Sequence, residues 1–189
     1  MGIVESEVNR LKKLVTNLLS LSTIENSYMG NSKITQLSIP SFASKLKNTF
    51  DILSKRKNIN ISYFYKDVDT YILFPKQWLE IIISNIIDNA IKYSSEESSI
   101  KVYFEIKDNY LIIKVIDFGA GICNEDLERI FERFYRGDKS HSSKIEGTGL
   151  GLSIVKHMID IIEGKIEVTS AVGEGSVFTI FIPIINNNS

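Results

Sequence analysis

The stretch Asn85-Ile-Ile-Asp-Asn-Ala-Ile-Lys-Tyr-Ser94 is followed by two glycine-rich blocks, Asp117-Phe-Gly-Ala-Gly121 and Gly147-Thr-Gly-Leu-Gly-Leu152. The first block has the apolar spacing of a helix, and the second follows a strand-like run that ends at Asp117. A polar loop separates the second block from the third, which opens another predicted helix. Each block alone is a weak signal, so the order of the blocks along the chain carries most of the information.

The composition is that of an ordinary globular protein, with 43% hydrophobic and 24% charged residues among 189. This length fits one compact domain and a smaller element. The net charge of −1 gives no electrostatic reason to expect nucleic acid or an anionic membrane as a partner. The single cysteine, Cys123, fits a reducing cytosol, and one cysteine with two histidines does not supply a structural zinc site. No apolar stretch is long enough to cross a bilayer, and we therefore expect a soluble, cytoplasmic chain.

Residues 6–26 have the spacing of one amphipathic helix. Its apolar residues recur in steps of three and four, as in a helix that packs on another helix: Val8, Leu11, Val15, Leu18 and Leu21. The polar segment at 25–32 contains Gly30-Asn31, which predicts a linker. The alternative is a surface helix that packs on its own domain.

From Leu37 onward, helical and strand-like segments are mixed. Apolar periodicity predicts helices over residues 41–57, 76–93, 125–130 and 149–162. Alternating or β-branched runs predict strands over residues 60–65, 71–74, 100–107, 111–116, 165–170 and 176–182. Helices combined with antiparallel hairpins predict an α/β sandwich, in which one mixed sheet is covered by helices on one face.

Turn and cap residues support these boundaries. Asp108-Asn109 suits a tight hairpin turn, and Gly173-Glu174-Gly175 joins the last two strands. Asn124 is the expected N-cap of the helix over 125–130. The helix over 41–57 is expected to present one apolar face made of Phe42, Leu46, Phe50 and Leu53.

Asn85, Asn89 and Lys92 lie on one face of the helix predicted over 76–93, at positions i, i+4 and i+7. Since the opposite face is apolar, this polar row needs water or a polar ligand. A carboxamide oxygen can coordinate Mg²⁺, its NH₂ group can contact phosphate, and lysine supplies a positive charge for phosphate. A solvated face of an amphipathic helix is the alternative.

Asp117 ends the apolar run at 111–116, and a carboxylate at that depth needs hydrogen-bond donors. The amino group of adenine is one such donor. Gly119 and Gly121 permit positive φ and close approach of the backbone to a flat base, and Ile122 adds an apolar wall. The alternative is an ordinary turn at the end of a strand.

Three alternating glycines, Gly147, Gly149 and Gly151, precede a predicted helix. Backbone N–H groups at a helix start form an anion-binding site. The segment is not a Walker loop, because no Gly-Lys-Ser/Thr follows, and it is not the dinucleotide fingerprint, because a polar loop precedes it in place of a strand. A flexible loop before a helix is the alternative, although three glycines are costly to order.

In this order and at these separations, the blocks resemble the ATP-binding domain of sensor histidine kinases, in the wider family shared with gyrase, Hsp90 and MutL. The resemblance implies a catalytic domain over residues 37–185 that binds ATP and Mg²⁺. It implies that Asn85 holds Mg²⁺ and that Asp117 binds adenine, with Thr179 supporting its carboxylate. The ATP-contacting residues that it implies are Asn85, Asn89, Lys92, Tyr93, Asp117, Gly119, Gly121, Ile122, Gly147, Thr148, Gly149, Leu150, Gly151, Leu152 and Thr179.

The segment Ile130-Phe-Glu-Arg-Phe-Tyr-Arg-Gly-Asp138 resembles the aromatic box that distinguishes histidine kinases within the wider family. Phe131 and Phe134 are expected to anchor this segment in the core. Arg136, together with Lys92, is the expected catalytic cation at the γ-phosphate. Residues 138–146 are polar except for Ile145, and we expect them to form a mobile lid over the nucleotide.

Two features depart from the family pattern. Members that hydrolyse ATP carry a water-activating Glu four residues before the Asn, where this chain has Ile81; Glu80 lies about 100° further round the helix. This difference favours transfer to a protein acceptor over hydrolysis. In addition, neither His141 nor His157 lies in a phosphoacceptor motif. Residues 1–30 resemble the second helix of a dimerisation hairpin and its linker, so we expect a fragment cut after the phosphoacceptor helix or a protein that lost it.

We therefore expect the catalytic domain of a sensor histidine kinase, which passes the γ-phosphate of ATP through a histidine to a response regulator receiver domain. The full-length protein is expected to be a homodimer, anchored in the cell membrane only by segments outside this sequence. Three alternatives are an ATP-hydrolysing switch of the Hsp90 or MutL type, a non-catalytic nucleotide-binding module, and an anti-sigma serine kinase, which would not need the helix over 6–26.

Overall fold

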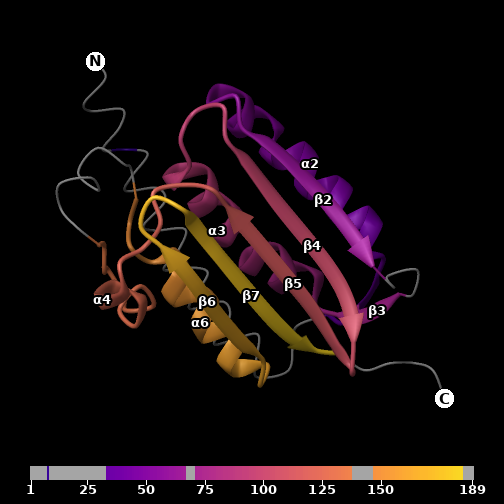
Figure 1. The fold of residues 1–189 in the computed structure, drawn as a ribbon. Coiled ribbons are helices and arrows are strands. Elements are labelled where there is room, and N and C mark those ends of the chain that lie inside the picture. The colour runs from indigo at the N-terminus through magenta and orange to yellow at the C-terminus, as the bar shows by residue number, and fades with distance from the viewer. Residues whose placement is uncertain (1–7, 9–32, 67–70, 138–146, 185–189) are drawn as a thin grey trace.

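The computed structural model describes residues 8, 33–66, 71–137 and 147–184. Its main strands are β2 (Asn60–Lys66), β4 (Ser99–Lys107), β5 (Tyr110–Asp117), β6 (Lys165–Ala171) and β7 (Gly175–Pro183). Its longer helices are α2 (Ile39–Arg56), α3 (Lys76–Tyr93) and α6 (Gly151–Ile161). The strands form one sheet in the order β2-β4-β5-β7-β6, and the three helices lie behind it on one face (Figure 1). The α/β sandwich predicted from the sequence is confirmed.

The sheet is mixed because of the pairing of β2. This strand runs parallel to β4, whereas every other neighbouring pair in the sheet is antiparallel. A parallel pair needs a crossover connection, and α3 supplies it between β2 and β4. The crossover places the polar row of α3 behind the centre of the sheet, where β5 ends.

A continuous apolar core lies between the sheet and the helices. The α3 helix alone buries Trp78, Leu79, Ile82, Ile83, Ile86, Ile87, Ala90 and Ile91. The predicted face of α2 is buried at Phe42, Leu46 and Phe50, but Leu53 is 40% exposed. The last turn of α2 buries Ser54 instead, because the chain folds back there and the Ile59 N–H donates to the Ser54 carbonyl oxygen at 2.9 Å.

The predicted hairpin between β4 and β5 is confirmed, with Asp108 and Asn109 at φ values of 50° and 64°. Two central residues with positive φ match the twist of the flanking strands. The same hairpin carries Asp117 to a position opposite Ile100, at the end of the sheet where β4 begins. The turn after Asp117 therefore lies beside the last turn of α3.

Two short elements differ from the sequence prediction. The β1 strand (Thr35–Leu37) was not predicted, and it pairs with β3 (Ile72–Phe74) in a separate two-stranded sheet. Three residues are too few to show a period in the sequence. The α4 helix covers only Asn124–Leu127, and Cys123 is its N-cap, so Asn124 is the first helical residue and not the cap.

Several expectations lie outside the described residues. They are the helix over 6–26, apart from Val8, the linker at 25–32, and the lid over 138–146. Among the residues that the structure describes, no helix combines the length and the apolar character needed to span a membrane.

Candidate functional site

The first two sequence blocks meet at the end of α3. The Ala120 N–H donates to the Tyr93 carbonyl oxygen at 3.0 Å. A methyl group added to Gly119 would collide with the same carbonyl oxygen. Gly119 is needed here because the backbone after β5 lies directly on the last turn of α3. The polar row of α3 and the turn after Asp117 thus belong to one site.

We expect Gly119→Ala to lower the free energy of unfolding by about 1–3 kcal/mol, because the added methyl group forces the turn away from α3. Nucleotide affinity should fall with it, since Asp117 moves with the turn. Gly147→Ala is the control for stability, because an added Cβ there would meet nothing within 4 Å. Thermal unfolding of both variants checks the prediction, and equal midpoints would show that the turn is free to shift.

Asp117 closes β5 and is only 5% exposed. Its Oδ1 accepts a hydrogen bond from the Gly119 N–H at 3.0 Å. Burial raises the pKa of the Asp117 carboxyl, and hydrogen bonds from Gly119 and from the backbone and hydroxyl of Ser176 oppose this rise. An ionised carboxylate has about four acceptor positions, so capacity remains for a donor on a ligand.

The structure does not bring Thr179 to Asp117. Thr179 lies opposite Lys114 on β5, whereas Ser176 lies opposite Asp117. Because side chains alternate across a strand, Thr179 shares the outer face with Lys114, and Asp117 lies on the helix-covered face with Val115. The prediction for Thr179 is corrected: Ser176, which sequence reasoning missed, holds the carboxyl.

The turn between β6 and β7 holds the second glycine of the motif. Gly121 has a φ of +70°, and a methyl group there would collide with the backbone of β6. The Gly173 N–H donates to the Ala120 carbonyl oxygen, and the Ile122 N–H donates to the Ser170 hydroxyl oxygen, both at 2.8 Å. Ile122 is partly buried against the core. The turn after Asp117 is therefore fixed on both sides.

The third block lies against Asn85. A Cβ added to Gly151 would stand 2.8 Å from Asn85 Oδ1, so α6 begins directly beside α3. The Asn85 Nδ2 donates to the Ile81 carbonyl oxygen at 2.8 Å. Gly149 has a φ of +70°, and its carbonyl oxygen accepts from the Phe134 N–H at 2.9 Å. The N-terminal end of α6, which favours anions, and the carboxamide row of α3 thus border the same space.

The apolar residues of the third block serve as its anchor. Leu150 is 1% exposed, and Leu152 packs against the core. The Leu150 N–H donates to the Thr148 hydroxyl oxygen at 3.3 Å. Both leucine side chains face protein, so any contact of these two residues with a ligand runs through the backbone.

The polar row on α3 is half-buried. The Lys92 ammonium lies 2.6 Å from an Asp88 carboxylate oxygen, in an i,i+4 ion pair. Asn89 is partly buried, and Tyr93 at the end of the row is 40% exposed. The described residues contain no group of three His, Cys, Asp or Glu side chains that could hold a metal ion. A carboxamide oxygen of the row can serve as one ligand of a cation.

Lys57 caps the C-terminal end of α3 from outside the three blocks. Its ammonium donates to the carbonyl oxygens of Ile91, Lys92 and Ser94, at 3.0, 2.8 and 3.1 Å. A cation at this end also interacts favourably with the helix dipole. Lys57 therefore stabilises the turn of α3 that carries Lys92 and supports Gly119. Sequence reasoning missed it, because a lone lysine after a helix has no distinctive pattern.

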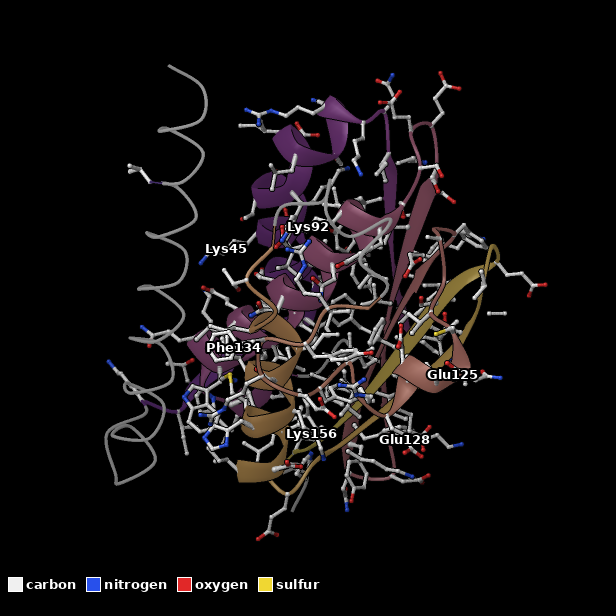
Figure 2. The ribbon with its side chains drawn as sticks, turned by 90° about the vertical axis from the view of Figure 1, so that its left-hand side faces the viewer. Lys45, Lys92, Glu125, Glu128, Phe134 and Lys156 are labelled. Atoms are coloured by element: carbon white, nitrogen blue, oxygen red, sulfur yellow. The ribbon has the colours of Figure 1, made fainter. Side chains whose placement is uncertain are left out.

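The aromatic box is only partly as predicted. Phe134 is 63% exposed and lies on the helical side of the molecule (Figure 2). Its backbone is held by a hydrogen bond to Gly149 and has a positive φ of 65°. Because the side chain is exposed, it does not anchor the segment in the core. Phe131 is half-buried, and Ile130 is the residue that packs against the core. Arg136 Nη1 lies 3.4 Å from the Gly147 carbonyl oxygen, beside the third block.

The position at which hydrolysing members carry a water-activating Glu is apolar in this chain, because it is Ile81. Ile81 packs against the core. The Glu80 carboxylate is bound to the Lys45 ammonium of α2 at 2.7 Å, in an ion pair between the two helices. Glu80 is therefore directed toward α2, whereas Asn85 faces α6.

Taken together, this fold and site define a nucleotide-binding α/β sandwich. Residues 75–186 match the family of histidine kinase-, DNA gyrase B- and HSP90-like ATPases. The chain belongs to this family, and its similarity to sensor histidine kinases makes it an ATP-binding catalytic domain of that kind.

The relatives are sensor kinases. The chain is 33% identical to sensor histidine kinase WalK of Bacillus subtilis. The match covers 96% of this chain and 30% of WalK. It is 34% identical to sensor histidine kinase RppB of Synechocystis, in a match that covers 97% of this chain and 40% of RppB. The chain thus spans less than half of these two relatives.

The fold agrees with solved structures. The Acinetobacter baumannii histidine kinase AdeS matches 98% of this chain and 84% of its own with a TM-score of 0.78 and 25% identity. The nucleotide-free catalytic domain of histidine kinase ThkA matches 80% of this chain and 95% of its own, with a TM-score of 0.69 and 25% identity.

Proposed function

We propose that this chain binds Mg-ATP between α3, the turn after β5 and the start of α6, and donates the γ-phosphate to a histidine on a dimerisation helix. A response regulator receiver domain would then take the phosphate onto an aspartate. One observation carries the proposal: Gly119 lies on Tyr93 and Gly151 lies on Asn85, so three blocks far apart in sequence border one space.

Asp117 would bind adenine. Its carboxylate is held by Gly119 and Ser176, and an acceptor-only group suits the exocyclic amino group of the base. Ile122 would form the apolar wall, while Gly119 and Gly121 leave the backbone bare for a flat ring.

The polar groups at the other end of the site would bind the phosphates. Lys92 and the backbone N–H groups of residues 147–152 are donors for anionic oxygens. Arg136, which lies beside Gly147, would balance the charge of the γ-phosphate during transfer.

The carboxamides of α3 suit Mg²⁺, which takes oxygen ligands and neutralises phosphate charge when it is bound. The resemblance implies Asn85 as the ligand. However, Asn85 donates its NH₂ group to Ile81, and its oxygen lies against the backbone of α6. We therefore assign the direct contact to the oxygen of Asn89, one turn closer to Tyr93, and a supporting position to Asn85.

Transfer to a protein fits this chain better than hydrolysis by an Hsp90-type switch, because position 81 is an apolar isoleucine and Glu80 is paired with Lys45 of α2. Residues 1–30 would supply the second helix of the dimerisation hairpin, and the full-length protein would be a homodimer.

Labelling with γ-labelled ATP tests the proposed function. This chain by itself should gain no acid-labile label, because neither of its histidines lies in a phosphoacceptor motif. A longer version of the protein that includes the phosphoacceptor helix should become labelled. It should then pass the label to the receiver domain of a response regulator. Steady release of phosphate without labelled protein would favour the hydrolysing switch and contradict the proposal.

A further inference from the structure

The β2 strand forms an open edge of the sheet. Its only neighbour in the described sheet is β4, and the Asn60 N–H is directed to that side, where it donates to the Ser98 carbonyl oxygen at 3.0 Å. Backbone groups alternate along a strand, so Ile61, Tyr63 and Tyr65 direct their N–H and C=O groups to the free side. The sequence of β2, Asn60-Ile-Ser-Tyr-Phe-Tyr-Lys66, has no proline and one charge. Lys66 at its end is the one charged residue of the strand, and no proline or bulge interrupts residues 60–66, so the rest of the edge is open to pairing.

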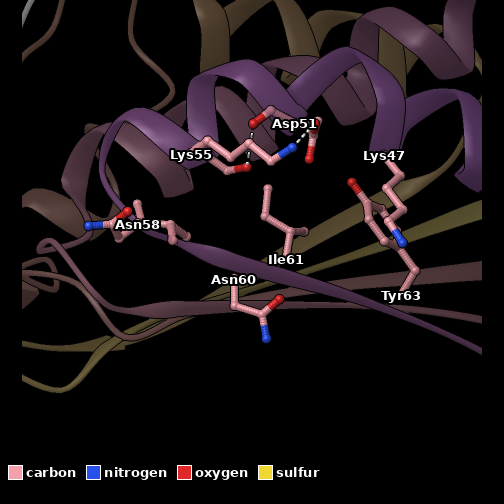
Figure 3. A pocket seen from close by; sticks show the side chains of 9 residues that line it. Lys47, Asp51, Lys55, Asn58, Asn60, Ile61 and Tyr63 are labelled. Atoms are coloured by element: carbon pink, nitrogen blue, oxygen red, sulfur yellow. Dashed lines mark hydrogen bonds and ion pairs between the residues drawn. The ribbon is translucent and has the colours of Figure 1, made fainter.

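A groove runs along this open edge. It is a cavity of about 340 Å³ between α2 and β2, and its walls include Lys47, Asp51 and Asn58 on the helical side and Ile61 and Tyr63 on the strand (Figure 3). Its volume lies near the lower end of the range of ligand sites, about 300–1,000 Å³. An edge strand beside a helix is the arrangement in which a peptide can add a strand and place its side chains in the groove.

Tyr63 lines this groove and carries a buried hydroxyl with no hydrogen-bond partner in the described part of the chain. Its phenol extends from β2 toward α2 (Figure 3). Burial raises the pKa of the Tyr63 phenol, so the hydroxyl stays protonated and is a donor at neutral pH. A buried donor without an acceptor is costly, and an acceptor on a bound ligand would remove that cost.

The charges of the groove favour an acidic ligand. Lys47 is exposed on the helical wall, and Lys55 is paired with Asp51 at 2.6 Å (Figure 3). Two lysines against one aspartate leave the helical wall with a positive charge. A carboxylate beside Tyr63 would accept from the hydroxyl and lie near Lys47.

We propose that the groove between α2 and β2 is a docking site for an extended acidic segment of a partner protein, which adds to β2 as a sixth strand. Backbone hydrogen bonds to Ile61, Tyr63 and Tyr65 supply affinity, and a carboxylate that faces the groove supplies specificity. The site lies at the far edge of the sheet from β6 and shares no residue with the nucleotide site, so the two are tested independently.

A second copy of this chain fits the groove less well. Two β2 edges in antiparallel contact would bring two positively charged α2 walls, each with Lys47, toward each other, and like charges oppose such a contact. An acidic peptide has no such opposition. The oligomeric state of the chain at NMR concentration separates the two cases.

The test uses the acetylated and amidated peptide Val-Thr-Val-Glu-Val-Thr-Val, titrated into the isotope-labelled chain. We expect saturable shifts of the amide signals of Ile61, Tyr63 and Tyr65. A peptide with Lys in place of Glu should bind about tenfold more weakly, because it loses the charged hydrogen bond. A peptide N-methylated at alternate residues cannot pair with the edge and should not bind.

Variants of the chain complete the test. Lys47→Glu should weaken the acidic peptide about tenfold, whereas Lys114→Glu, the same change on the opposite face of the sheet, should not. Tyr63→Phe should weaken binding without lowering the unfolding midpoint, because the hydroxyl has no partner to lose. The proposal is overturned if the acidic peptide causes no shifts or causes shifts that map away from β2. It is also overturned if the Lys peptide binds equally well, or if the free chain forms a dimer through β2.

Discussion

Replacing Asp117 with asparagine should reduce ATP affinity about 10- to 100-fold while leaving the fold intact. An amide can offer an NH₂ group where the adenine amino group needs an acceptor, and a mispaired buried donor costs about 1–3 kcal/mol. Titration calorimetry with ATP and ADP measures the loss. Asp160→Asn is the matched control, because it makes the same chemical change at an exposed position of α6.

The stability of the same variant should move in the opposite direction from its affinity. Burial raises the pKa of the Asp117 carboxyl, so the folded chain binds a proton more readily than the unfolded chain. The stabilising effect of that proton is complete below the unfolded pKa of about 4 and is lost as pH rises through the higher folded pKa. At pH 7 the asparagine variant should therefore unfold at the same temperature or higher, and its advantage should shrink at acid pH. A large drop in the unfolding midpoint would show that Asp117 is structural.

The sequence predicted those parts of the fold that repeat a period over several turns or alternations. The apolar residues of α3 recur over five turns, and its bounds were predicted as residues 76–93. The β1 strand has only three residues and forms by pairing with β3, which is distant in the sequence, so its own sequence has no period that predicts it. The exposure of Leu53 is likewise set by the turn after α2, through the contact of Ile59 with Ser54, and not by the helix period.

The glycine positions of the site could be predicted because their cause is local. Gly119 and Gly121 each lie so close to another backbone segment that a Cβ atom would collide with it. Only glycine fits such a position, so closely spaced glycines in a sequence indicate it. The partner of Asp117 could not be predicted in this way. Whether Ser176 or Thr179 meets the carboxyl depends on the register of β7 against β5, and a shift of one residue turns a side chain to the other face of the sheet.

Replacing Asn89 with alanine should remove the part of ATP affinity that depends on Mg²⁺. Asn89 is half-buried on the row between Asn85 and Tyr93, and its oxygen is the ligand that we assign to the ion. Metal contacts of this kind contribute several kcal/mol, so the loss should reach about 100-fold when Mg²⁺ is present. With a chelator in place of the ion, wild type and variant should bind ATP equally. Asn48→Ala, at an exposed position of α2, is the control.

Asn85→Ala should behave differently, and the difference decides which carboxamide holds the ion. Asn85 touches both Ile81 and the start of α6 through Gly151. Its loss should loosen the contact between α3 and α6 and weaken ATP binding with and without Mg²⁺. If Asn85→Ala removes only the Mg²⁺-dependent affinity and Asn89→Ala leaves it intact, the ion is held by Asn85. In that case the Asn85 side chain must turn away from Ile81 when the nucleotide enters.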